Sequence, residues 1–151
     1  MTRRRTARTN RSPPDVAPCA RMRAMRVQSV FVANHAEITP KGLLSVTGGG
    51  WEFFKVRSLP ANMRGVFAGF IDVEPSEVAS PVQLRFTVGP DGLEPRALGS
   101  RVIRGKVRQP AFAFPFVVVI DSLDPIACRL LGPEGDELAV VELEIRMREK
   151  E

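Results

Sequence analysis

The strongest constraint on the fold is a period-two alternation of apolar and polar residues, which recurs in short segments along most of the chain. In the segment 82–88, Val, Leu, Phe and Val alternate with Gln, Arg and Thr. In 141–147, apolar residues alternate with Glu and Arg. Successive side chains of a β-strand point to opposite faces of a sheet, so this pattern predicts half-buried strands.

Turns rich in glycine and proline separate about eight such segments. They lie at 27–33, 43–47, 51–56, 64–73, 82–88, 111–120, 126–130 and 141–147. The pattern predicts an all-β fold, an antiparallel β-sandwich of immunoglobulin-like type, with a small β-barrel as the alternative. The segment 111–120 is apolar at every position. This composition predicts a central strand covered on both faces, although Pro115 indicates a bulge or an edge. Residues 93–110 show no readable pattern.

The first 24 residues differ from the rest in charge. They contain seven arginines and one acidic residue, a net charge of +6, whereas residues 25–151 carry a net charge of −1. With few apolar side chains to bury, residues 1–24 are expected to form a disordered basic extension before a single β-sandwich domain at 25–151. The alternative is that translation starts near Met25. Weak, non-specific binding to nucleic acid is expected only if the extension is real, and specific binding is not expected.

The inventory of reactive side chains is small. The chain contains two cysteines, Cys19 and Cys128, and a single histidine, His35. Their spacing matches no metal motif, so neither a metal nor a cofactor is expected. No apolar run approaches the roughly 18 residues of a membrane helix, and the N-terminus lacks the apolar stretch of a secretory signal. We therefore expect a cytoplasmic protein without a membrane partner.

The first candidate binding patch joins a polar stretch to a glycine run. Its members are Asn34, His35, Gly49, Gly50 and Trp51. The polar residues follow the predicted strand 27–33 and are expected to form a loop at its end. Three consecutive glycines indicate an unusual backbone path, which we expect to let Trp51 cover the end of the core. Because a strand and not a helix follows them, a phosphate-binding loop is not indicated.

The second candidate, the basic row, is a set of four cations in a stretch that contains no acidic residue. Its members are Arg101, Arg104, Lys106 and Arg108. Such a row can meet phosphate or an acidic partner, or it can be a solvated edge that discourages pairing between sheets. No aromatic side chain is interleaved to stack on bases, which single-strand binders usually supply.

Several short motifs of the first two thirds occur in a recognisable order. The segment Ala-Asn-His-Ala-Glu at 33–37 precedes a Lys-Gly turn at 41–42 and the Gly-Gly-Gly-Trp motif at 48–51. Ala-Ser-Pro at 79–81 and a Pro-Asp-Gly turn at 90–92 follow. This order resembles an uncharacterised bacterial family annotated only as a domain of unknown function, whose members begin near the position of Met25. The resemblance implies no activity, ligand or partner.

No grouping of side chains predicts catalysis. Two pairs of carboxylates, Asp121 with Asp124 and Asp136 with Glu137, lie in predicted turns, where Asp has local reasons to occur. No nucleophile stands beside His35 in a recognised context. The leading hypothesis is a non-catalytic module that binds a protein partner or has a structural role. The alternative is a small-ligand-binding protein or an enzyme that uses Asn34, His35 and Trp51.

Overall fold

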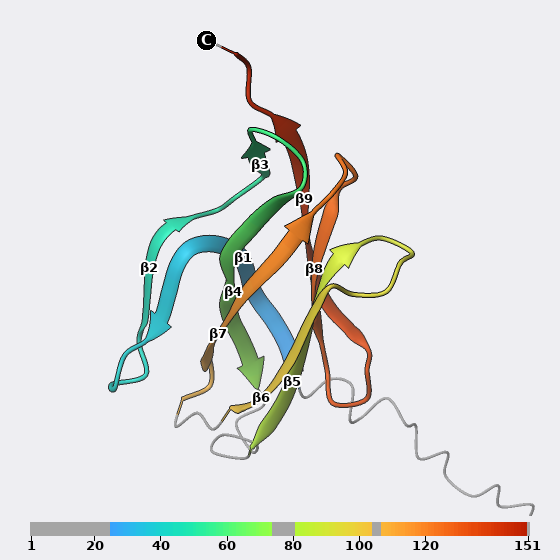
Figure 1. The fold of residues 1–151 in the computed structure, drawn as a ribbon. Helices are drawn as coiled ribbons and strands as arrows, with labels where there is room; N and C mark the ends of the chain where they lie inside the picture. Colours follow the sequence, from blue (N-terminus) through green and yellow to red (C-terminus); the bar gives the residue numbers. More distant parts are fainter. Residues whose placement is uncertain (1–24, 74–80, 104–106, 151) are drawn as a thin grey trace, which may run out of the picture.

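Two β-sheets make up the described part of the chain (Figure 1). The computed structural model describes residues 25–73, 81–103 and 107–150. The first sheet has the strand order β2 (Leu44–Gly49), β1 (Met25–Ile38), β4 (Ala61–Val73) and β7 (Ala111–Ile120). The second has the order β3 (Phe53–Val56), β9 (Glu137–Met147), β8 (Ile126–Leu131), β5 (Val82–Pro90) and β6 (Ala97–Ile103). The predicted all-β sandwich is confirmed, with nine strands where about eight were expected.

Most neighbouring strands run antiparallel. The last two strands, β8 and β9, form the antiparallel pair that their short connection predicts. The exception is β3, which pairs with β9 in parallel. No ladder between described strands joins the two sheets, so the arrangement is a sandwich and not the closed barrel considered as the alternative.

The inner faces of both sheets form one core, and the alternation of β5 shows how. Val82, Leu84, Phe86 and Val88 are buried, while the residues between them are exposed or half-buried. Aromatic rings connect the two sheets at the centre. Phe86 of β5 stacks on Phe114 of β7, with the ring centroids 4.6 Å apart. Burying each such side chain contributes roughly 1.5–3 kcal/mol, so the packed inner faces of the two sheets stabilise the fold most.

One strand, β6, went unrecognised in the sequence because it is an edge strand and its two largest exposed apolar side chains face water, while Ala97 and Ile103 pack against the core. Leu98 is 72% exposed and Val102 is 60% exposed. The strand pairs only with β5 among the described strands. Since neither face of β6 is buried in the regular alternating way, its sequence carries no period-two signal.

The expectation that 111–120 forms a central strand is wrong, because β7 is one of the two edge strands of the first sheet among the described strands, as Pro115 indicated. The amide of Ile71 donates to the carbonyl of Pro110, and that of Val73 donates to the carbonyl of Arg108. Even-numbered residues at this end of the ladder therefore bond to β4, and odd-numbered residues point away from it. Pro115 thus lacks its N–H at a position where no ladder bond forms, as proline requires.

The expected loop at 34–37 is also wrong, since these residues continue strand β1 as far as Ile38. Ala33 pairs with Val66 of β4 on one side and with Gly49 of β2 on the other. Beyond Ala33, β1 leaves β4 and pairs with β2 alone. Figure 1 shows the sharp curve that this change of partner produces.

The curved end of β1 packs on the outer face of the first sheet. Ala36 forms a second, smaller apolar cluster with Val66, Ala68 and Ala113, and the half-buried Phe31 and Leu44 pack against it. The alternation of β4 therefore buries side chains on both faces, with Met63 and Phe67 in the main core and Val66 and Ala68 in the small cluster. This packing fixes the β1–β2 hairpin above β4 and β7.

Some predictions concern parts of the chain that the structure does not describe. The expected extension at 1–24 lies outside the described residues, as do Arg104 and Lys106 of the basic row. Within the described ranges there is no helix with the length and apolar character needed to cross a membrane.

Candidate functional site

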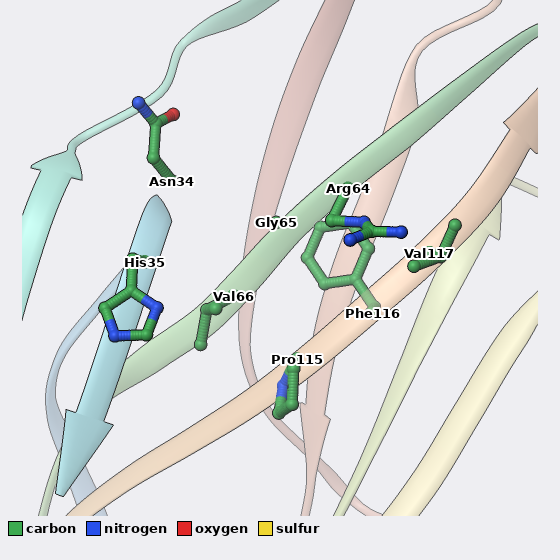
Figure 2. Close-up of a pocket in the computed structure, with 8 residues that line it drawn as sticks. All are labelled: Asn34, His35, Arg64, Gly65, Val66, Pro115, Phe116 and Val117. Atoms are coloured by element: carbon green, nitrogen blue, oxygen red, sulfur yellow. The ribbon is translucent and has the colours of Figure 1, made fainter.

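An open hollow of about 340 Å³ lies where the curve of β1 meets the outer face of β4 and β7 (Figure 2). Its lining comes from three strands that are far apart in the sequence: Asn34, His35, Arg64, Gly65, Val66, Pro115, Phe116 and Val117. Apolar side chains of β4 and β7 form its floor, and three polar side chains stand around it. This volume is at the small end of the range for ligand pockets.

The side chain of Asn34, at the rim, lies against Gly48 of β2. A Cβ atom on Gly48 would lie 2.6 Å from Asn34 Nδ2, a distance that real Cβ atoms do not tolerate. Gly48 also has a φ of 62°, in the left-handed region that favours glycine. Close packing against Asn34 thus explains why glycine occupies position 48.

Two cationic or potentially cationic groups line the hollow. Arg64 extends from β4 on the same face as Val66, and it has no ion pair with any described residue. His35 Nε2 lies 3.7 Å from the carboxylate of Glu37, two residues along the same strand. An arginine carries five N–H donors in a planar fork, and His35 and Asn34 add further donors. The hollow is therefore suited to a group with hydrogen-bond acceptors, such as a carboxylate or a peptide carbonyl.

The lining contains one side chain of the kinds that commonly act in acid–base catalysis, His35. Its described residues include no Ser, Thr, Cys, Asp or Glu that could serve as a nucleophile, and the carboxylate near His35, that of Glu37, lies outside the lining. Among the described residues, no three side chains of His, Cys, Asp or Glu come together to hold a metal ion. The geometry supports recognition by shape and hydrogen bonding.

The other members of the first candidate patch lie apart from the hollow. Gly49 pairs with Ala33 in the β1–β2 ladder, and the amides of Gly50 and Trp51 both donate to the carbonyl of Val32. Trp51 is half-buried against the main core, as expected of a residue that covers the core end. Its indole N–H donates to the carbonyl of Gly48 at 2.9 Å, and its ring stacks on Phe54. The structure therefore brings Asn34 and His35 to the hollow and Trp51 to the core.

The described half of the basic row is engaged in local contacts. The Arg101 guanidinium lies 5.8 Å from the centroid of the Phe114 ring. Arg108 lies 3.9 Å from Oδ1 of Asp72, an oxygen that is buried and accepts no hydrogen bond from the described residues. These two contacts hold the guanidinium groups close to the domain.

The shifted pKa values belong to side chains away from the hollow. Burial raises the pKa of the Cys128 thiol to about 12, so the thiol stays protonated and unreactive near neutral pH. A hydrogen bond to Asp91, with a second to Glu137, raises the pKa of Arg129 on the outer face of the second sheet. Both side chains therefore contribute to the structure, Cys128 in the core and Arg129 on the surface.

Sequence reasoning missed six of the eight lining residues: Arg64, Gly65, Val66, Pro115, Phe116 and Val117. Alternation along 64–73 does place Arg64 on the face opposite the main core. It does not show that the end of β1 curves over that face, because the curve depends on a change of pairing partner. Only the polar run Asn34–His35 gave a signal.

Comparison with models of known protein families and with curated proteins finds no match for this chain. The resemblance to an uncharacterised bacterial family therefore stays a prediction.

Proposed function

We propose that this chain is a non-catalytic interaction module, which holds a segment of a partner protein in the hollow on the outer face of its four-stranded sheet. The observation that carries this proposal is the composition of the hollow and its surroundings. The apolar floor includes Val117, which is 53% exposed, and Val119, which is 51% exposed, follows it on the same face of β7. Arg64, His35 and Asn34 supply donors around it.

Protein interfaces commonly consist of an apolar centre with hydrogen-bonding groups at the rim. A side chain that enters a pocket at such a centre contributes most of the binding energy. The hollow offers both an apolar centre and hydrogen-bonding groups at its rim, on one open face. A free thiol at Cys128, with no disulfide among the described residues, is compatible with a cytoplasmic place for this interaction.

A small molecule with a carboxylate is the second candidate ligand. Arg64 and His35 would bind its charge, and the volume of the hollow accommodates a compact ligand. This alternative predicts that a small dicarboxylate such as glutarate raises the melting temperature, and that Arg64→Ala removes the effect. The protein-partner hypothesis predicts no such dependence on small carboxylates.

The deciding experiment compares proteins captured from native cells by two matched variants. Val117→Glu places a charge at the hollow, and Val140→Glu places the same charge on the outer face of the second sheet, where Val140 is 45% exposed. We expect a partner that wild type and Val140→Glu retain and that Val117→Glu loses by about tenfold or more. A partner set that both variants retain equally would rule out the hollow as the binding site.

A further inference from the structure

Two segments that lie about 90 residues apart in the sequence bring four cations together at one end of the molecule. Strands β3 and β9 run side by side there (Figure 1). They pair in parallel, with Lys55 directly opposite Arg146. The amide of Arg148 donates to the carbonyl of Val56 at 2.8 Å, so the pairing continues past the end of the strands. Arg57 and Arg148 follow at this end, and all four side chains are exposed. We call Lys55, Arg57, Arg146 and Arg148 the cationic patch.

Like charges directly opposite each other destabilise a sheet, so this arrangement has a cost within the domain. The ring of Phe53 offsets part of it, since Arg146 Cζ lies 4.3 Å and Lys55 Nζ lies 5.6 Å from its centroid. Arg146 also donates to Glu144 at 2.7 Å, which raises the pKa of Arg146 and lowers that of Glu144. The other three cations have no ion pair with a described residue.

The backbone beside the cationic patch has unused hydrogen-bonding groups. Among the described strands, β3 is the last of its sheet and pairs with β9 only. The carbonyls of Glu52 and Val56 accept bonds from β9, so even-numbered residues face that strand. The N–H and C=O groups of Phe53 and Lys55 then point toward the free edge. An unpaired edge can accept an additional strand, and the short length of β3 and its exposed Lys55 disfavour strands that lack a complementary negative charge.

We propose that the cationic patch binds an acidic segment of a partner protein in extended conformation, which adds to β3 as a further strand of the sheet. Alternate side chains of an added strand lie on one face, about 4.8 Å from the neighbouring strand. Acidic side chains at every second position would therefore lie against Lys55 and Arg57. This binding surface is separate from the hollow and does not depend on the function proposed for it.

A polypeptide fits these features better than a nucleic acid does. The free carbonyls of Phe53 and Lys55 can accept hydrogen bonds from peptide N–H groups, which a phosphodiester backbone does not supply. The Phe53 ring already contacts the two cations, which would compete with a base for stacking on it. The positive charge of the patch would attract either partner, whereas the free backbone groups of β3 favour the polypeptide.

Fluorescence anisotropy of the full chain with a labelled ten-residue peptide of alternating Glu and Thr tests the proposal. We expect Lys55→Glu and Arg148→Glu each to raise the dissociation constant by about tenfold or more. Arg85→Glu is the matched control, since Arg85 is exposed on β5 of the same sheet, and should change it by less than about twofold. Every variant keeps the arginines of residues 1–24, so differences between variants report on the patch.

The same peptide with N-methyl groups at alternate positions tests the added strand without altering the protein. We expect about tenfold weaker binding in the methylation register that removes the N–H groups facing β3, and protection of the Phe53 and Lys55 amides from hydrogen exchange with the unmodified peptide. Equal binding by both methylation registers, equal loss in Arg85→Glu, or no binding of the peptide would overturn the proposal. So would a stronger response of the patch variants to oligo(dT) than to the peptide. Val117→Glu should leave peptide binding unchanged, which separates this site from the hollow.

Discussion

At the scale of single residues, Gly48 connects backbone conformation to the geometry of the hollow. It combines a φ of 62° with a missing Cβ that would lie 2.6 Å from Asn34 Nδ2. Gly135 has a φ of 82° and open space around its missing Cβ. Comparing substitutions at the two glycines therefore separates the cost of backbone strain from the cost of a steric clash.

We predict that Gly48→Ala lowers the free energy of unfolding by about 2–3 kcal/mol, whereas Gly135→Ala lowers it by about 1 kcal/mol. Adding Asn34→Ala to Gly48→Ala should bring the cost down toward that of Gly135→Ala, because the clashing side chain is gone. Urea denaturation measures all three values. Equal costs for the two glycine variants would mean that Asn34 moves aside freely.

Trp51 is half-buried, packs on the core, stacks on Phe54 and donates one hydrogen bond. We predict that Trp51→Ala lowers the free energy of unfolding by about 2 kcal/mol, below the 3–5 kcal/mol of a fully buried aromatic side chain. As the chain has one tryptophan, its emission reports on this site alone. We expect partly blue-shifted emission with limited acrylamide quenching, and fully quenched emission would contradict the packing on the core.

The burial of Cys128 makes the stability of the folded chain depend on pH. Burial raises its pKa from 9.0 to about 12, so between these values the unfolded chain loses a proton that the folded chain keeps. The folded state thus loses stability as pH rises through this window, by up to about 1.4 kcal/mol per pH unit. We predict this slope in wild type and its absence in Cys128→Ala, by urea denaturation from pH 8.5 to 11. Parallel curves for the two proteins would show that the thiol ionises in the folded state.

At the scale of elements, β7 is an edge strand with two protective features. Pro115 removes a donor from the free edge, and the guanidinium of Arg96 donates to the carbonyl of Val119 at 2.6 Å and to Asp121 at 2.8 Å. Both features reduce the tendency of an edge to pair with another molecule.

We predict that the double variant Pro115→Val, Arg96→Ala forms dimers at concentrations where wild type does not, because it restores a free donor and uncovers an acceptor. Sedimentation velocity measures the change. Arg85→Ala, which removes an exposed arginine from β5, is the control and should leave the oligomeric state unaltered. A double variant with the sedimentation coefficient of wild type would show that other features protect this edge.

Most elements could be predicted from sequence because a strand with one buried face carries its alternation in every second residue. β5 and the β8–β9 pair followed this rule. β6 did not, since Leu98 and Val102 face water. The curve of β1 was hidden for another reason, because it arises where Ala33 exchanges one partner strand for another. Local sequence records which face is buried and does not record which strand is the neighbour.

At the scale of the whole molecule, the two proposed binding surfaces lie on different sheets. The hollow combines residues of β1, β4 and β7, and the cationic patch combines β3 and β9. The sequence indicated part of the hollow through Asn34 and His35, which are adjacent in the chain. It did not indicate the patch, because parallel pairing of β3 with β9 joins segments whose proximity no local pattern encodes.

Charge distribution is a property of the whole chain and gives the last prediction. Residues 1–24 carry a net charge of +6, and residues 25–151 carry −1. Neutralising phosphates with arginines releases counterions, so affinity that depends on residues 1–24 should fall steeply with salt. We predict that the full chain binds duplex DNA weakly at 50 mM salt and that a variant starting at Met25 does not, as measured by fluorescence anisotropy. Binding of equal strength by both forms would assign the DNA contact to the domain, and Lys55→Glu would then show whether the cationic patch makes it.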